Sequence, residues 1–190
     1  MIKLAIFASG AGSNAAKIIE HFKNSSTVVI DLIVCNKKEA GVWGIAAANQ
    51  IDTLYINRES FIVSDTCVKE LQARSIDFIV LAGFLWKVPE SLINAYPGKI
   101  INIHPALLPK YGGKGMYGMH VHEAVIAAGE KESGITIHYV DAHYDEGDII
   151  FQAKCTIEPN DTPASLAAKI HVLEHAHFPV VIENLLKELI

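Results

Sequence analysis

Residues 3–14 read KLAIFASGAGSN, an apolar run of strand length that passes directly into a loop with two glycines. Helical periodicity follows over residues 14–22. A strand, a glycine loop and a helix in this order are typical of the first unit of an α/β fold. Bare backbone N–H groups and the positive end of such a helix can receive a phosphate. The stretch therefore predicts an α/β fold and an anion site in its loop.

The same alternation continues along the first half of the chain. Residues 79–81, Ile-Val-Leu, are apolar on both faces, which is typical of a strand covered by helices on both sides in a parallel sheet. The expected strands are residues 3–8, 28–35, 53–56, 78–81 and 99–103, and the expected helices are residues 14–22, 42–50, 60–73 and a short helix opened by Pro89.

The pattern changes after Pro105. Residues 105–118 carry two prolines and four glycines and are expected to form a long functional loop. A helix over 119–128 follows, then two strands, 135–140 and 148–157, that pair antiparallel, and a last helix with Thr162 as its cap that runs nearly to Ile190. We predict a single Rossmann-like α/β domain over residues 1–190, mostly parallel, with antiparallel strands near the C-terminal end.

The composition argues against some classes of function. A chain of 190 residues with 51% hydrophobic and 19% charged residues is globular, and a formal net charge of -5 argues against nucleic-acid binding. Three scattered cysteines fit a reducing compartment, and no apolar run is long enough to span a membrane. We expect a cytoplasmic protein, monomer or homodimer, that acts on small molecules without nucleic acid or membrane.

The glycine loop satisfies the dinucleotide spacing Gly10-x-Gly12-x-x-Ala15. That fingerprint also needs an acid at the end of the second strand, which here ends in Cys35-Asn36. Asp31 lies in the middle of that strand. A mononucleotide or sugar phosphate is therefore favoured over NAD, and a plain turn between strand and helix remains the alternative.

A second candidate site is Asn102-Ile103-His104 at the end of a core strand. Alternation sends Asn102 and His104 to one face, at the strand end where ligands of open α/β sheets bind. An amide can donate to a developing oxyanion, and an imidazole can carry a proton near neutral pH. The pair suits acyl transfer; the alternative is a histidine that only completes the strand end.

The run Asn102-Ile-His-Pro-Ala-Leu-Leu-Pro-Lys110 resembles the Asn-Ile-His-Pro-Ser-Leu-Leu-Pro signature of the formyl transferases that use 10-formyltetrahydrofolate. Residues 9–14 are similar to that family's phosphate loop, and Leu81-Ala-Gly-Phe84 to its fourth-strand end. Asp145-Glu-Gly147 and the strand after it resemble its acidic loop. The resemblance covers residues 4 to about 183.

The resemblance implies transfer of a formyl group from 10-formyltetrahydrofolate to the amine of glycinamide ribonucleotide. It assigns catalysis to Asn102, His104 and Asp145, where Asp145 would raise the pKa of His104. It implies contacts of the ribonucleotide with Gly12, Ser13, Asn14 and Glu174. It implies a folate slot formed by Leu85, Trp86, Lys87, Val88, Asn102, Val140, Asp141 and Asp145.

Two features depart from the family pattern. Many relatives carry arginines for the folate tail near the positions of Trp86 and Ser64, and Lys87 is the nearest cation here. The loop 112–118 is also a few residues longer than in the commonest relatives.

Several alternatives stay open. Leu85 and Val88 could be core residues, and Asp145 a turn residue. His138 could face the active site or be a packed histidine. His171-x-x-Glu174-His175 matches a zinc-protease pattern, but no third ligand follows at a suitable place, and we expect no metal. A formyltetrahydrofolate hydrolase and a non-catalytic nucleotide-binding module are the competing functions.

Overall fold

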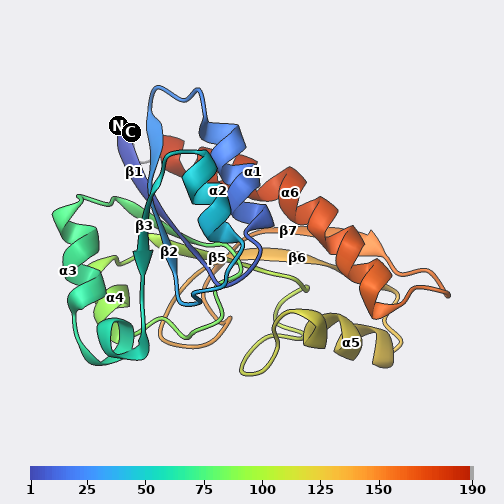
Figure 1. Cartoon of the computed structure of the whole chain (residues 1–190). Coiled ribbons are helices and arrows are strands. Elements are labelled where there is room, and N and C mark those ends of the chain that lie inside the picture. The colour runs from blue at the N-terminus through green and yellow to red at the C-terminus, as the bar shows by residue number, and fades with distance from the viewer. Residues whose placement is uncertain (189–190) are drawn as a thin grey trace. The chain divides into compact units, whose positions relative to one another are not determined.

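The computed structural model describes residues 1–188, and the chain divides into two compact units, Met1–Ile101 and Asn102–Ile190. Figure 1 labels most of their helices and strands. Strand β5 (Ile100–His104) begins in the first unit and ends in the second. The two units are described in turn.

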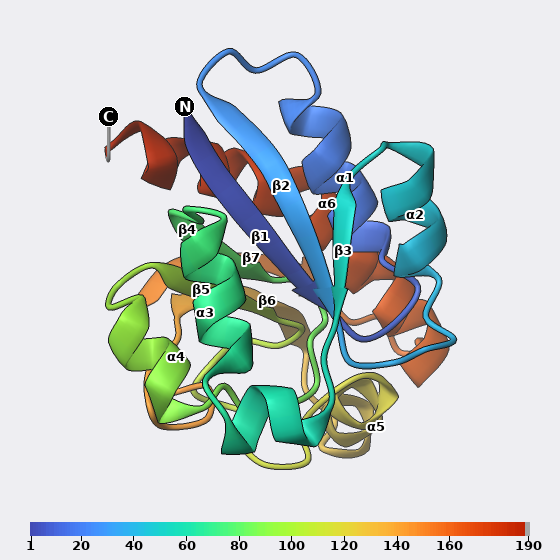
Figure 2. The same cartoon turned by 60° about the vertical axis from the view of Figure 1, so that its left-hand side comes forward.

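The first unit holds a parallel sheet in the order β3-β2-β1-β4, and the start of β5 follows β4. Figure 2 shows β1, β2 and β3 side by side. The strands are β1 (Ile2–Ala8), β2 (Val28–Cys35), β3 (Asp52–Tyr55) and β4 (Phe78–Leu81). The helices are α1 (Ser13–Phe22), α2 (Val42–Ala48), the π-helix η1 (Glu59–Val63), α3 (Thr66–Ala73) and α4 (Glu90–Ala95).

Strand β1 is the centre of this sheet, and its residues from Leu4 to Ala8 are fully buried. Helices α1 and α2 lie on one side of β1–β3, and α3 and α4 lie on the other (Figure 1). Burying a side chain such as Phe7 contributes about 1.5–3 kcal/mol. A strand that is apolar on both faces is therefore stabilised by both helical layers.

The single helix expected over residues 60–73 is wrong. The structure has η1 and α3 instead, separated at Ser64, whose backbone is extended with φ -113° and ψ 160°. The Ser64 hydroxyl donates to the Glu59 carbonyl oxygen at 3.0 Å and lies 2.9 Å from the Thr66 hydroxyl. Side-chain hydrogen bonds of this kind compete with helical backbone bonds and end the first helix here.

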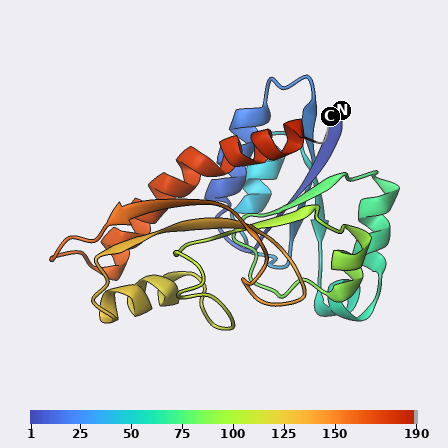
Figure 3. The ribbon, with the colours of Figure 1, turned by 180° about the vertical axis from the view of Figure 1, so that it is seen from behind.

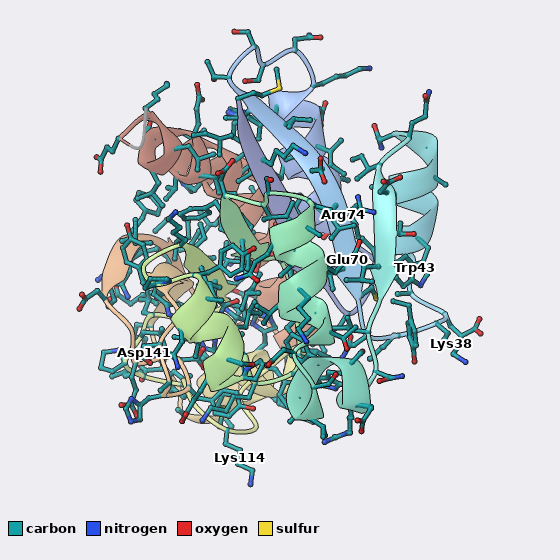
Figure 4. The ribbon with its side chains drawn as sticks, turned by 90° about the vertical axis from the view of Figure 1, so that its left-hand side faces the viewer. Lys38, Trp43, Glu70, Arg74, Lys114 and Asp141 are labelled. Atoms are coloured by element: carbon teal, nitrogen blue, oxygen red, sulfur yellow. The ribbon has the colours of Figure 1, made fainter. Side chains whose placement is uncertain are left out.

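A cluster of charges ties α3 to the sheet. Arg74 Nη1 contacts Asp52 Oδ2 at 2.9 Å, and Arg74 Nε contacts Glu70 Oε1 at 2.8 Å. Figure 4 shows Glu70 and Arg74 together at this helix. Asp31 Oδ1 forms an ion pair with Lys3 Nζ at 3.0 Å, and Asp31 Oδ2 lies 3.6 Å from Arg74 Nη1. Asp31, in the middle of β2, therefore takes part in the ion pairs between the sheet and the end of α3.

In the second unit, the end of β5 is followed by β6 (Glu132–Tyr139) and β7 (Ile149–Thr156), which pair antiparallel as predicted. Strand β6 begins three residues before the predicted start. The helices are α5 (Met119–Ala127) and α6 (Pro163–Lys187). Figure 3 shows α6 running alongside β6 and β7.

Helix α6 begins as its sequence predicts. The Thr162 side chain accepts from the Ser165 backbone N–H, the Ser165 hydroxyl accepts from the Thr162 N–H, and Pro163 occupies the first turn. This reciprocal cap satisfies two otherwise unpaired donors. The predicted extension toward Ile190 lies partly outside the described residues.

The predicted α/β class is confirmed, with mostly parallel strands and an antiparallel pair near the C-terminal end. Residues 105–118 form the predicted long loop without helix or strand. Among residues 1–188, no helix combines the length and the apolar character that crossing a membrane requires.

Candidate active site

The end of β5 presents two polar side chains at alternate positions in the second unit. Asn102 is half-buried and His104 is 3% exposed, and Ile103 between them is buried. Successive side chains of a strand point to opposite faces, so the amide and the imidazole share one face. Both predicted residues therefore lie on the same side of the strand.

His104 is held by two neighbours. Its Nε2 lies 2.7 Å from the Tyr111 carbonyl oxygen, which only accepts, so Nε2 carries a proton and donates it. Its Nδ1 lies 3.6 Å from Asp145 Oδ2. The nitrogen that gains or loses a proton is therefore Nδ1, the atom that faces the carboxylate.

Asp145 connects the imidazole to the long loop. Its Oδ2 accepts from the Gly113 backbone N–H at 2.9 Å, and its Oδ1 lies 3.6 Å from His138 Nε2. Burial alone would raise the pKa of this carboxyl, but His138, His104 and the Gly113 N–H together lower it. The group is therefore an anion at neutral pH.

The expected rise in the pKa of His104 is wrong in its net direction. Burial penalises the charged imidazolium and lowers the pKa, and this outweighs the opposing effects of Asp145 and the Tyr111 carbonyl. A sequence shows the nearby acid but not the depth of burial. The imidazole is consequently neutral at pH 7 and ready to accept a proton.

His138 on β6 links Asn102 to Asp145. Its Nδ1 donates to the Tyr139 carbonyl oxygen at 2.8 Å, so in the neutral ring Nε2 accepts from Asn102 Nδ2 at 3.1 Å. An amide nitrogen has two N–H donors, and this bond uses one. Of the two interpretations left open for His138, the structure has it facing the site.

The loop around residue 112 approaches Asp145 closely. A Cβ on Gly112 would come within 2.5 Å of Leu108 Cδ2 and 3.3 Å of Asp145 Cβ. Such a contact forces a shift of at least one neighbour. Glycine at 112 therefore allows the loop to bring the Gly113 N–H up to the carboxylate.

Thr136 is a supporting residue that sequence reasoning missed. It is fully buried on β6, its hydroxyl donates to the Ala106 carbonyl oxygen at 2.7 Å, and it accepts from the Leu108 N–H at 3.0 Å and Gln152 Nε2 at 2.9 Å. These bonds fix the loop directly after His104. The only signal in the sequence is a hydroxyl inside an apolar strand.

Glu174 on α6 belongs to the same electrostatic neighbourhood. It is 5% exposed, and its Oε2 lies 2.9 Å from His171 Nδ1. Its charge acts on His104 and on His122 of α5. The structure therefore brings the predicted ribose-binding carboxylate into electrostatic reach of the predicted catalytic histidine.

The predicted phosphate loop lies in the first unit, where Gly12 precedes α1 with φ 81°. A Cβ on Gly12 would lie 2.8 Å from Val42 Cγ2, so packing against α2 as well as the left-handed backbone requires glycine. Ser13 is exposed and Asn14 is buried. Their contacts with a ribonucleotide remain predictions.

The residues of the predicted folate slot that lie in the first unit differ in their exposure to solvent. Val88 is buried, with 5% exposure, whereas Leu85 is exposed. Trp86 packs on Phe61 with ring centroids 6.0 Å apart, and the Arg58 guanidinium lies 5.6 Å from its ring centroid. Roles for Leu85, Trp86, Lys87 and Val88 in folate binding remain predictions.

The second-unit part of the slot is the loop after β6. Val140 is half-buried, and Asp141 Oδ1 accepts from the His143 N–H at 2.8 Å. Neither observation identifies a ligand, so the folate roles of Val140 and Asp141 also remain predictions.

In the part of the chain that the structure describes, no group of three or more His, Cys, Asp or Glu side chains could hold a metal ion.

Comparison with known proteins gives the family. The model of the formyl transferase family matches residues 2–182. The chain is 41% identical over 98% of its length to the chloroplastic phosphoribosylglycinamide formyltransferase of Arabidopsis thaliana, of which it spans 66%, slightly under two thirds. It is 38% identical to the Bacillus subtilis phosphoribosylglycinamide formyltransferase, again over 98% of the chain and 95% of that protein.

A solved structure agrees with these relatives. Glycinamide ribonucleotide transformylase 1 from Geobacillus kaustophilus superposes with a TM-score of 0.89 at 34% identity, over 97% of this chain and 98% of that one. The family match covers nearly every described element, from β1 to most of α6. The chain belongs to the formyl transferase family.

Proposed function

We propose that this protein is a phosphoribosylglycinamide formyltransferase, which transfers the formyl group of 10-formyltetrahydrofolate to the amine of glycinamide ribonucleotide in purine biosynthesis. The observation that carries the proposal is the set formed by the half-buried Asn102 and Asp145 and the buried His104, joined through His138. Relatives named for this activity cover 98% of the chain at 38–41% identity. The folate is a co-substrate, and no step of the proposed chemistry needs a metal.

The chemistry needs two groups at one carbon atom. The amine attacks the formyl carbon, the carbonyl oxygen becomes an oxyanion, and the attacking nitrogen carries a surplus proton. The second N–H of Asn102 stabilises the oxyanion. The neutral His104 takes up the surplus proton.

The leaving group then needs that proton back. As the carbon–nitrogen bond to the folate breaks, the protonated His104 returns the proton to the leaving nitrogen. Asp145 stabilises the imidazolium in the interval, because its carboxylate faces Nδ1 at 3.6 Å. A base whose pKa lies near or below neutral suits this sequence of uptake and return.

The ribonucleotide would bind through the Gly12–Asn14 loop and Glu174, and the folate through residues 85–88 and 140–145. We propose that residues 1–190 act as one formyl transferase domain in the cytoplasm, as a monomer or homodimer and without nucleic acid. The net charge of -5 supports a substrate other than nucleic acid.

A spectrophotometric assay of 10-formyltetrahydrofolate consumption, with and without glycinamide ribonucleotide, tests the proposal. We expect consumption only when the ribonucleotide is present, with one formylated product per folate released. Formate release without the ribonucleotide would identify a hydrolase instead. Ribonucleotide binding without turnover would identify a binding module, and either result overturns the proposal.

A further inference from the structure

The motif His171-x-x-Glu174 is a second histidine–carboxylate pair, distinct from His104 and Asp145. Its Nδ1 to Oε2 distance is 2.9 Å, and the two side chains are 57% and 6% exposed. Positions three apart on a helix lie on the same face, one turn above the other. The exposed imidazole thus reaches back to a carboxylate that is almost completely buried.

A buried carboxylate needs hydrogen bonds to hold it in one orientation. A bond from an imidazolium is charge-assisted and roughly twice as strong as one between neutral groups. His171 therefore fixes one oxygen of Glu174. In doing so, it sets the direction of the whole carboxylate.

Other titratable groups surround the pair. Helix α5 contributes His122, whose Nδ1 is buried and has no hydrogen-bond partner among the described residues, and the end of β5 contributes His104. His175 stacks on His171 with ring centroids 6.1 Å apart. The elements packed on α6 from the sheet contribute His138 of β6, which acts on His104, and the uncharged Phe151 ring of β7 against His177.

We propose that His171 is a positioning residue that orients the Glu174 carboxylate for the ribose hydroxyls and makes the affinity for the ribonucleotide depend on pH. The inference rests on the proposed function, because it takes Glu174 as the acceptor of those hydroxyls. It adds a residue whose own contact is with Glu174 and whose ring is open to solvent.

The direction of the pH effect follows from the charges. The hydrogen bond to Glu174 raises the pKa of His171, whereas burial lowers the pKa of His104 and of His122. His171 is therefore the last of the three to lose its proton as pH rises. Above its pKa the donor is a neutral imidazole, so the bond to Glu174 loses the attraction between opposite charges, the carboxylate is held less firmly, and ribonucleotide affinity falls.

The test compares KM for glycinamide ribonucleotide in the wild type and His171→Gln between pH 6 and 8.5. The ratio of the two values cancels the ionisation of the substrate itself. We expect the variant's KM to be about three- to tenfold higher at pH 6 and nearly equal at pH 8.5, with kcat unchanged. A ratio that does not change with pH would overturn the inference.

His120→Gln is the matched control. His120 and Glu123 have the same spacing on α5, with 3.4 Å between Nδ1 and Oε2, but their side chains are 64% and 56% exposed. A pair with both members in solvent holds no buried carboxylate, so this variant should match the wild type throughout. An equal KM effect in the control would also contradict the inference.

NMR titration of the histidine rings separates this inference from the proposed function. The pKa of His171 should lie above its ordinary value in the wild type and should fall in Glu174→Gln, where burial acts without the carboxylate. Added ribonucleotide should raise the pKa of His171 in the wild type, because coupling between proton and ligand is reciprocal. Turnover without any shift of His171 would overturn the inference alone. Absence of ribonucleotide binding altogether would overturn both.

Discussion

The pairs His104–Asp145 and His171–Glu174 differ in which partner is buried. In the first pair the imidazole is almost completely buried and 3.6 Å from its carboxylate, and its pKa falls. In the second pair the imidazole is 57% exposed and 2.9 Å from its carboxylate, and its pKa rises. An acid beside a histidine therefore does not decide its protonation; burial and distance do. The two pairs suit different tasks, proton transfer and substrate orientation.

Asn102→Ala should strongly lower the rate of the formyl transfer in which the His104–Asp145 pair takes part. Losing an oxyanion donor typically lowers kcat by about 10²- to 10³-fold, and we expect little change in either KM. Steady-state kinetics with both substrates measure this. A large rise in KM at constant kcat would instead make Asn102 a binding residue.

Asp145→Asn should lower kcat by about 10²-fold, because the imidazolium intermediate loses its counter-ion. The amide oxygen can still accept from the Gly113 N–H, so the loop contact is retained. Since Asp145 raises the pKa of His104, its loss should move the acid limb of the kcat/KM profile to lower pH. Asp148 is exposed, and Asp148→Asn is the control. If the acid limb does not move in Asp145→Asn, Asp145 does not act on the pKa of His104 as assigned.

The sequence predicts those parts of this arrangement in which the interacting residues lie close together along the chain. Strand alternation correctly predicts that Asn102 and His104 share a face, and the cap at Thr162 is a local signal. The Tyr111 carbonyl as partner of His104 was not predictable, because it depends on the path of a glycine-rich loop. Nor was the helix break at Ser64, where side-chain hydrogen bonds override helical periodicity.

Gly112→Ala should disturb the approach of the loop to Asp145. The added Cβ would lie 2.5 Å from Leu108 Cδ2, and overpacking of this kind costs about 1–3 kcal/mol of unfolding free energy. Gly44→Ala is the control, because nothing lies within 4 Å of its added Cβ and it lies within α2. Urea unfolding should show a loss for the first variant and a gain of up to about 1 kcal/mol for the second. Equal midpoints for both would contradict the crowded loop.

The smallest expected effect is on the pH dependence of stability, which should differ in sign between His104 and His171. The folded-state pKa values of His104 and His122 are lowered, so the unfolded chain binds more protons below about pH 6.5 and acidification destabilises the protein. His171 has the opposite sign: its contribution is present below about 6.5 and is lost as pH rises through its raised pKa. His171→Gln should therefore lose less than about 1 kcal/mol at pH 5.5 and nothing at pH 8.5, measured by urea unfolding. A loss confined to high pH would reverse the assignment.

The rate of formyl transfer in a single turnover, measured by rapid quench with enzyme in excess over both substrates, tests the division between the two pairs most directly. We predict that His104→Ala slows the chemical step by about 10²- to 10⁴-fold at a saturating enzyme concentration, whereas His171→Gln transfers the formyl group at the wild-type rate. A wild-type rate in His104→Ala, or an equal loss in both variants, would contradict the account.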